Sequence, residues 1–325
     1  MPDTPLLDIA NLQTHFFVRG QVAKAVDNVS LTIESGKTLG LVGESGCGKS
    51  VTAHSIIQLI PDPPGKIVGG QIIFSGNDLL AYSEKQMRKI RGNQISMIFQ
   101  EPMTSLNPVF SVGEQVAEVI RLHKKLSAKE TRARVIDMFQ RVGIPAADQR
   151  LDEYPHQMSG GMRQRVMIAM ALACNPKMMI ADEPTTALDV TIQAQILDLM
   201  NKLKADTGAS ILFITHDLGV IAKFCDYVLV MYAGKIVERA DVKTLFKGNR
   251  HPYTRGLINS LPHLGKKQQR LASIKGQPPD LLNLPKGCPF EPRCDYSVER
   301  CSCDYPPIEP VDKEHFISCW RWREI

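Results

Sequence analysis

The sequence predicts an α/β fold with a mostly parallel sheet and a phosphate-binding loop. Up to residue 235 short apolar segments alternate with helical periodicity, the pattern of a parallel sheet covered on both faces. The octapeptide Gly43-Glu44-Ser45-Gly46-Cys47-Gly48-Lys49-Ser50 has phosphate-loop spacing: a glycine, four free positions, then Gly-Lys-Ser. A strand predicted at 38–42 precedes it, and a helix predicted over 49–60 follows it. This context disfavours a chance match in a glycine-rich turn.

The octapeptide supplies what a polyphosphate needs. Gly43, Gly46 and Gly48 let successive backbone N–H groups wrap closely around phosphate oxygens, and the helix N-terminus favours anions. Lys49 can reach the β- and γ-phosphates, and the Ser50 hydroxyl is placed to ligate Mg²⁺. The sequence therefore predicts a nucleotide-binding protein.

The composition indicates a globular chain with a sizeable core. Of 325 residues, 43% are hydrophobic and 22% charged, and the net charge of +5 is not gathered in a Lys/Arg run that would indicate nucleic-acid binding. The N-terminus lacks the long apolar run of a secretion signal, and the longest apolar stretch, 166–174, is half the length needed to span a bilayer. We therefore expect any membrane role to be exercised through a partner.

The segment before the loop predicts β-strands at 6–9, 12–18 and 29–33, an antiparallel opening beside a parallel core. Phe16 lies in the second of these strands. It could stack on an adenine ring, although a phenylalanine in a strand more often belongs to the core.

Beyond the break at 61–65, strands are predicted at 70–74 and 94–99 and a helix at 83–92. Gln100 follows the second strand, where ligands are met in such sheets; an ordinary strand-end polar residue is the alternative. The helical periodicity of 112–144 then predicts an inserted helical subdomain.

A second candidate phosphate contact is Ser159-Gly160-Gly161, which immediately precedes a predicted helix. After that helix, the buried strand predicted at 178–181 ends in Asp182 and Glu183. Adjacent residues of a strand point in opposite directions, so one acid can hold Mg²⁺ through its solvation shell while the other polarises a water.

Three further elements complete the predicted sheet domain. These are a turn at 185–189, a helix at 191–204 and a strand at 211–214, with His216 just beyond the strand.

The composition changes after residue 250. Ten of the 21 prolines and five of the eight cysteines fall in residues 251–325. We therefore expect that this tail does not continue the sheet, and we place a domain boundary near 250. Without a secretion signal, the cysteines are expected to be reduced thiols or metal ligands.

Four tail cysteines are candidate ligands of a metal centre: Cys288, Cys294, Cys301 and Cys319, with Cys303 as an extra thiol. Four thiolates indicate either a Cys₄ zinc site or an iron–sulfur cluster. The separations of five, six and seventeen residues lack the Cys-x-x-Cys pairs of structural zinc, which favours the cluster. Four free thiols in a flexible tail are the alternative.

Together these motifs resemble those of the ATPase subunits of ABC transporters. Six elements occur in that family's order: Phe16, the loop at 43–50, Gln100, the signature at 159–161, the acids at 182–183, and His216. The segments 97–108, 181–191 and 251–254 and the terminal cysteines resemble the dipeptide/oligopeptide importer branch. One departure is Met162, where many members carry Gln.

The resemblance implies a P-loop ABC-type nucleotide-binding domain over 1–250. Such a domain has a mixed, mostly parallel sheet, an antiparallel β subdomain and a helical subdomain, here at about 103–165. A small cysteine-containing extension over 251–325 follows.

The resemblance also implies site roles. ATP would be bound by Phe16, Gly43, Glu44, Ser45, Gly46, Cys47, Gly48, Lys49, Ser50, Val51, Gln100, Ser159, Gly160, Gly161, Asp182 and His216. Glu183 would act on the attacking water, His216 would contact the γ-phosphate, and Gln100 would sense metal and water. Mg²⁺ would be held by Ser50, Gln100 and Asp182, and Asp189 would tie the two halves of the site together. A [4Fe–4S] cluster would occupy the four cysteines.

In this family two ATPase domains sandwich two ATPs, each between the phosphate loop of one and the signature of the other. The resemblance therefore implies a second, homologous ATPase subunit, two membrane permease subunits, and indirectly an extracytoplasmic solute-binding protein. It implies a peripheral location on the cytoplasmic face of the inner (cell) membrane and no nucleic-acid partner.

Rival functions are an importer ATPase for another solute, such as an antimicrobial peptide or metal complex, and a DNA- or ribosome-associated ABC ATPase. Only 58 residues separate Gln100 from Ser159, which leaves no room for a DNA-type coiled coil, and the single loop disfavours a tandem ribosomal type. The intact Glu183 and His216 argue against a non-hydrolysing subunit. The sequence does not identify the solute, because such an ATPase does not touch the cargo.

Overall fold

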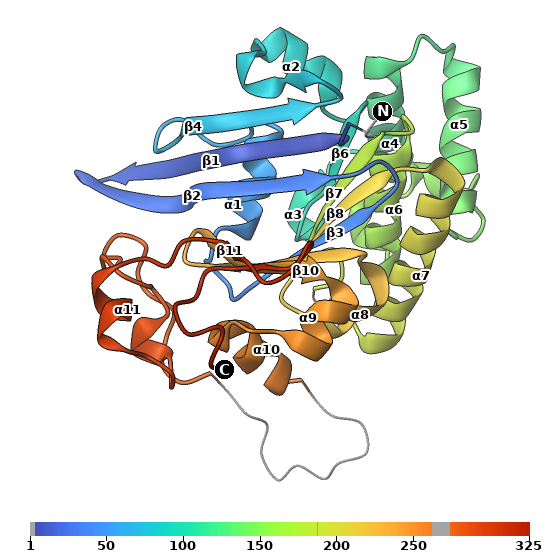
Figure 1. The fold of residues 1–325 in the computed structure, drawn as a ribbon. Coiled ribbons are helices and arrows are strands. Elements are labelled where there is room, and N and C mark those ends of the chain that lie inside the picture. The colour runs from blue at the N-terminus through green and yellow to red at the C-terminus, as the bar shows by residue number, and fades with distance from the viewer. Residues whose placement is uncertain (1–3, 187, 262–273) are drawn as a thin grey trace. The chain divides into compact units, whose positions relative to one another are not determined.

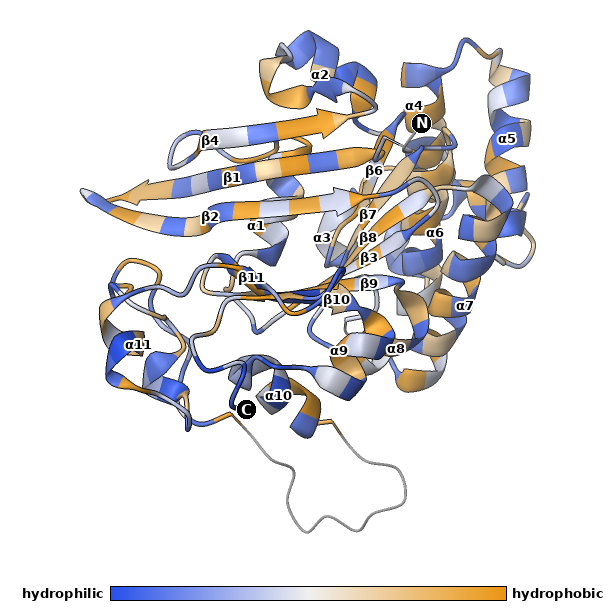
Figure 2. Ribbon diagram, viewed as in Figure 1, coloured by the Kyte–Doolittle hydropathy of each residue, from blue (hydrophilic) through white to orange (hydrophobic). Residues whose placement is uncertain are grey.

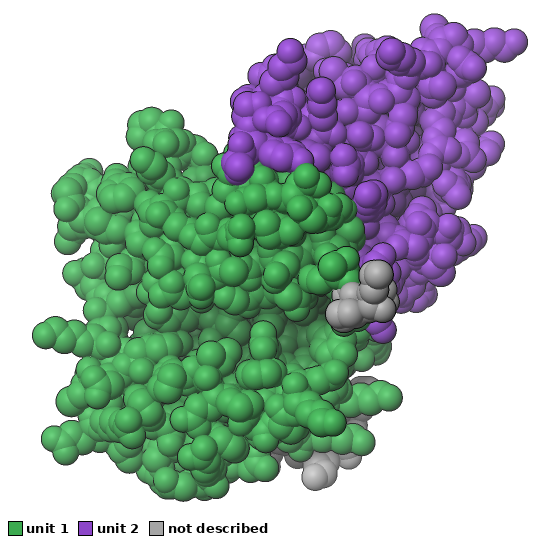
Figure 3. Space-filling model, turned by 45° about the horizontal axis from the view of Figure 1, so that its top comes forward, with its two compact units in different colours: residues 1–34, 38–80, 214–325 green, residues 35–37, 81–213 purple. Residues whose placement is uncertain are grey.

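The computed structural model describes residues 4–186, 188–261 and 274–325 (Figure 1). These residues form two compact units, coloured in Figure 3. Unit 1 comprises residues 1–34, 38–80 and 214–325, and unit 2 comprises residues 35–37 and 81–213. The phosphate loop and the cysteine-rich tail both belong to unit 1.

Unit 1 contains the expected antiparallel sheet, with strand order β2-β1-β4-β5. Its strands are β1 (Leu7–Val18), β2 (Gln21–Ile33), β4 (Gly65–Phe74) and β5 (Asn77–Asp78). Apolar and polar residues alternate along β1 and β2, so that one face is buried (Figure 2). The two strands predicted at 6–9 and 12–18 are one strand, which is irregular near Asn11, at φ 49°.

The second sheet of unit 1 places β3 parallel to β9, and β9 antiparallel to β10. Its strands are β3 (Thr38–Val42), β9 (Tyr227–Tyr232), β10 (Lys235–Asp241), β11 (Glu309–Pro310) and β12 (Phe316–Ile317). The helices of the unit are η1 (Leu79–Ala81) at its boundary, α1 (Lys49–Ile56), α8 (Leu218–Phe224), α9 (Val242–Gly248), α10 (Pro252–Asn259), η4 (Glu291–Arg293) and α11 (Glu299–Cys303). All five residues of β3 are buried, as predicted for the strand before the loop.

Helix α1 is shorter than the predicted 49–60. It ends at Ile56 because the chain turns there: the N–H of Leu59 donates to the carbonyl of His54, and Gln58 takes a left-handed φ of 50°.

The expectation that the tail does not continue the sheet is wrong. β12 pairs antiparallel with β10, through Glu238 opposite Ile317 and Arg239 opposite Phe316, and β11 pairs with β12. A proline-rich segment can extend a sheet when its strands are short and lie at the edge, because an edge residue such as Pro310 needs no partner on its outer side.

A buried carboxylate fastens this added edge. Glu238 on β10 is 0% exposed, and it accepts hydrogen bonds from the N–H groups of Arg250 (2.7 Å) and His251 (3.2 Å). Nε2 of the buried His315 lies 2.8 Å from the same carboxylate. Three partners thus satisfy a group whose burial alone would be costly.

Unit 2 contains the parallel pair β6 and β7, and helices that include the predicted helical segment. Its elements are α2 (Glu84–Ile90), β6 (Ile95–Ile98), α3 (Pro102–Ser105), α4 (Val112–His123), α5 (Ala128–Arg141), η2 (Arg150–Asp152), η3 (Pro155–Gln157), α6 (Gly160–Leu172), β7 (Met178–Asp182), α7 (Val190–Thr207) and β8 (Ser210–Thr215), which crosses the boundary. The segment 112–144 forms two helices because Ser111 and Ser127 cap separate helices, accepting hydrogen bonds from the N–H groups of Glu114 and Glu130.

Among the described residues no helix has the length and apolarity needed to cross a membrane.

Removal of the Glu238 carboxylate should destabilise the tail edge. Each buried donor left without an acceptor costs about 1–3 kcal/mol. We therefore expect Glu238→Ala to lower the free energy of unfolding by several kcal/mol in urea denaturation. Glu299→Ala, at an exposed position of the same region, is the control and should change it by no more than about 0.5 kcal/mol. Equal stability of the two variants would contradict the anchoring role.

Candidate nucleotide site and cysteine pocket

The phosphate loop lies between β3 and α1 in unit 1, where the sequence predicts it. Lys49 is the first residue of α1, and its Nζ donates to the carbonyls of Gly43 (2.8 Å) and Glu44 (3.0 Å). The side chain is buried, with 5% of the residue exposed. The ammonium therefore lies inside the loop, where the β- and γ-phosphates of a nucleotide would be met.

Two glycines are required by the close approach of neighbouring strands. A Cβ on Gly43 would lie 2.2 Å from the carbonyl oxygen of Met231, and one on Gly48 would lie 2.1 Å from that of Ala25. Gly48 also takes a φ of 108°, which L side chains rarely adopt. The loop cannot carry side chains at these points without moving.

Burial also affects the thiol inside the loop. Cys47 is 5% exposed, and burial raises the pKa of its thiol although the ammonium of Lys49 opposes that shift. Cys47 is therefore a neutral packing residue at neutral pH.

Contacts from the C-terminal region hold the second residue of the loop. The N–H of Glu44 donates to the hydroxyl of Tyr253 (2.8 Å), and its carboxylate accepts two hydrogen bonds from Arg293 (2.6 and 2.9 Å). In the sequence, Tyr253 stands out only as part of a segment that resembles the family, and Arg293 does not stand out. No local pattern signals a contact between residues 249 positions apart.

Phe16 shares a strand face with a residue that contacts α1. The hydroxyls of Thr14 on β1 and Ser55 on α1 are 2.8 Å apart, and Phe16, two residues on, has the same orientation because side chains alternate along a strand. The half-buried Phe16 ring lies beside Gly65 of β4, whereas Phe17 points to the other face and is 50% exposed. The face of Phe16 is thus the one that packs on the loop helix.

His216 also belongs to unit 1. It follows β8 and is exposed, and the next residue, Asp217, caps α8 by accepting from the N–H of Gly219.

The two predicted acids lie at the C-terminal end of β7 in unit 2, Asp182 within the strand and Glu183 just beyond it. Asp182 is the last residue of the strand and 3% exposed. Glu183 takes an unusual left-handed φ of 47°. Its carboxylate accepts hydrogen bonds from Nε2 of Gln100 (3.2 Å) and the hydroxyl of Thr186 (2.9 Å). The structure thus brings Gln100 and Glu183 together and adds Thr186, which the sequence analysis did not assign to the site.

The signature segment begins α6, also in unit 2. The Ser159 hydroxyl caps this helix by accepting from the N–H of Met162 (3.3 Å), and Ser159 and Gly160 are exposed. Gly161 is limited by packing, because a Cβ there would lie 3.0 Å from Ile192 of α7. Asp189 caps α7 through the N–H of Ile192 (2.9 Å). The side chains of Ser159 and Asp189 therefore each stabilise the start of a helix in unit 2.

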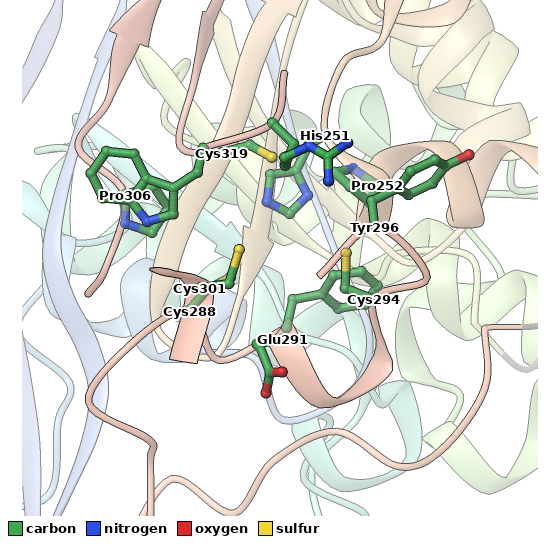
Figure 4. A pocket seen from close by; sticks show the side chains of 12 residues that line it. His251, Pro252, Cys288, Glu291, Cys294, Tyr296, Cys301, Pro306 and Cys319 are labelled. Atoms are coloured by element: carbon green, nitrogen blue, oxygen red, sulfur yellow. The ribbon is translucent and has the colours of Figure 1, made fainter. Parts of the chain in front are cut away.

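Four of the five tail cysteines line one pocket of unit 1: Cys288, Cys294, Cys301 and Cys319. In Figure 4 the sulfur atoms of Cys294 and Cys301 both point upward, toward the side of the pocket where the sulfur of Cys319 lies. The cavity itself is small, about 20 Å³, and the empty space that includes open solvent at its mouth is about 340 Å³. Cys303 is exposed and does not line this pocket.

Burial governs the chemistry of these thiols. Burial first, and the charges of neighbouring cysteines second, raise the pKa of Cys288 to about 12 and that of Cys319 to about 11. Burial likewise raises the pKa of Cys294. In the described part of the chain no group of three or more His, Cys, Asp or Glu side chains is arranged to hold a metal ion.

The orientation of Phe16 leads to a test with a matched control. If its ring stacks on adenine, Phe16→Ala should weaken ATP binding by roughly 1–3 kcal/mol, the usual size of base–aromatic stacking. Phe17→Ala removes a ring from the opposite face and should leave the affinity unchanged. Titration with a fluorescent ATP analogue would compare them. A loss of affinity confined to Phe17→Ala would identify Phe17 as the platform instead.

Comparison with known proteins places these features in a family. A family model described as "ABC transporter" matches residues 26–186, and one described as "Oligopeptide/dipeptide transporter, C-terminal region" matches residues 237–301. Among similar structures is that of the dimeric ATP-binding cassette MJ0796 bound to ADP and Pi, with a TM-score of 0.66 and 27% identity, covering 73% of this chain and 98% of that one.

Curated relatives cover the whole chain. A putative peptide import ATP-binding protein of Brucella ovis is 51% identical over 336 aligned residues, which span 100% of this chain and 99% of the relative. The oligopeptide transport ATP-binding protein AppD of Bacillus subtilis is 50% identical, over 98% of this chain and 97% of the relative. The phosphate loop, the paired acids and the matched C-terminal region thus identify the chain as a member of the ABC transporter family, an ATP-binding ATPase with the C-terminal region of oligopeptide/dipeptide transporters.

Proposed function

We propose that this chain is the ATP-hydrolysing subunit of an ABC importer for di- or oligopeptides. The observation that carries the proposal is a phosphate loop, with the Lys49 ammonium held inside it, in a chain that has the oligopeptide/dipeptide C-terminal region. Relatives that align over nearly the whole chain are named peptide import or oligopeptide transport ATP-binding proteins.

The proposed chemistry is transfer of the γ-phosphoryl group to water, which depends mainly on positioning and charge neutralisation. Lys49 would contact the β- and γ-phosphates. Bound Mg²⁺ would offset phosphate charge, with Ser50, Gln100 and Asp182 as its holders. Glu183 would orient the attacking water, its carboxylate steadied by Gln100 and Thr186.

Pairing would complete each site. The exposed Ser159 and Gly160 at the start of α6 suit a contact with nucleotide held by another subunit, because a helix N-terminus attracts phosphate. We infer a heterodimer with a second, homologous ATPase, peripheral to the membrane on the cytoplasmic side of two permease subunits. An extracytoplasmic binding protein would deliver the peptide to these permeases.

The cysteine pocket would hold a [4Fe–4S] cluster. Four cysteines lining one cavity are the ligand set of such a cluster. Cys288, Cys294, Cys301 and Cys319 would be the ligands, and exposed Cys303 would remain free. Bound there, the cluster would join four separate points of the tail.

Glu183→Gln tests the catalytic assignment. The amide keeps the size of the side chain but cannot accept a proton from water, so ATP hydrolysis should fall by orders of magnitude while ATP binding persists. The measurement is ATP turnover and peptide uptake by the transporter reconstituted with its permease subunits. Near-normal turnover would remove Glu183 from this role, and turnover without peptide uptake by the wild type would reject the peptide importer.

Metal analysis tests the cluster. Protein purified without oxygen should be brown and contain about four irons per chain. Cys319→Ser should lower the iron content, whereas Cys303→Ser should preserve it. Colourless protein with one zinc would reject the cluster, and the opposite response of the two variants would make Cys303 the fourth ligand.

A further inference from the structure

Arg293 joins the cysteine pocket to the phosphate loop. It is the last residue of η4, between Cys288 and Cys294, and its side chain is 5% exposed. Its Nη1 and Nη2 donate to the two carboxylate oxygens of Glu44, at 2.6 and 2.9 Å. This paired geometry is specific to a guanidinium and is stronger than a neutral hydrogen bond.

Aromatic side chains support the same connection. The hydroxyl of the fully buried Tyr253 accepts a hydrogen bond from the N–H of Glu44. The centroid of its ring lies 4.6 Å from that of Tyr232 and 5.4 Å from that of Phe290. The hydroxyl of Tyr232 accepts a further hydrogen bond from Arg293 (3.2 Å). The C-terminal region therefore holds both the backbone and the side chain of Glu44.

The segment that carries Arg293 also shapes the cysteine pocket. Cys288, Phe290 and Cys294 all line it. Cys288 donates its N–H to the carbonyl of Cys301 (2.7 Å), and Arg293 donates its N–H to that of Phe290 (3.0 Å). A change in the positions of Cys288 and Cys294 must therefore alter the turn from which Arg293 reaches the loop.

At the loop, Glu44 connects Arg293 to Lys49, the residue proposed to contact phosphate. The carbonyl of Glu44 accepts from Nζ of Lys49 (3.0 Å), so the orientation of this peptide group helps to set the position of the ammonium. A carboxylate beside a polyphosphate site would repel the ligand unless its charge is neutralised, and Arg293 supplies that neutralisation.

We propose that Arg293 is a positioning residue for the phosphate loop, and that occupation of the cysteine pocket and nucleotide binding are linked through it. The inference rests on the proposed function, because it takes the loop as the ATP site and the cysteines as metal ligands. A group that orders residues 288–294 then orders Glu44 and raises nucleotide affinity. By reciprocity, bound nucleotide strengthens retention of the metal.

The first experiment measures nucleotide affinity of the full chain with a fluorescent ATP analogue. Arg293→Ala should weaken binding about tenfold, within the usual range of coupling between sites. Arg293→Lys should recover only part, because an ammonium cannot match both carboxylate oxygens. The control is Lys275→Ala, which removes a positive charge from the same region at an exposed ion pair with Asp295 and should bind as the wild type does.

A double-mutant cycle separates positioning from general destabilisation. In a Glu44→Gln background, Arg293→Ala should cause a much smaller further loss of affinity than it causes in the wild type. Thermal unfolding of each variant, measured in parallel, shows whether a loss of nucleotide affinity is accompanied by a loss of thermal stability. Wild-type affinity of Arg293→Ala, or a fully additive cycle, would overturn the positioning role.

The second experiment measures metal content and affinity for the ATP analogue in the same variants. Cys301→Ser should lose metal and weaken binding of the analogue, with no additional loss when it is combined with Arg293→Ala. If Cys301→Ser loses its metal but binds the analogue with unchanged affinity, the linkage is wrong. Wild-type protein that contains no metal would also overturn the linkage. The Arg293 titrations still decide the positioning role in that case. Failure of the proposed function is distinct, because the wild type would then not bind the analogue.

Discussion

The close approach of two neighbouring strands constrains the phosphate loop. The backbone at Gly43 and Gly48 passes so near the carbonyls of Met231 and Ala25 that even a methyl group does not fit. The path of the loop is thus fixed by β9 and by the chain of β2, not by the loop alone. Because Lys49 directly follows Gly48, the same constraint places the first turn of α1 and the ammonium.

Local patterns predicted the elements that local chemistry determines. The octapeptide specified a strand, a tight loop and a helix because its spacing fits only that geometry, and the antiparallel opening followed from alternation along the chain. The extent of α1 was less accurate, since the left-handed turn at Gln58 stops the helix before Pro61 does. Helix ends depend on such single residues, which periodicity does not register.

Contacts between residues far apart in the chain could not be predicted from local sequence patterns, for a physical reason. Arg293 and Glu44 meet only after the tail has returned to the loop, and composition argued that the tail stood apart from the sheet. That argument failed at β11 and β12, because an edge pairing of two residues, fastened by a buried carboxylate, needs no apolar run. The assignments of Phe16, His216 and the four cysteines remain predictions.

The hydrogen bonds of Lys49 hold its ammonium in place before any ligand arrives. Its Nζ donates to the carbonyls of Gly43 and Glu44, which uses two of the three donors of an ammonium. In the role proposed for Lys49, the third donor would meet a phosphate oxygen while both of these bonds persist. A side chain that is already fixed has little rotamer freedom left to lose on binding. The loop is thus preorganised: the conformational entropy of its lysine is lost when the chain folds, and not when the nucleotide binds.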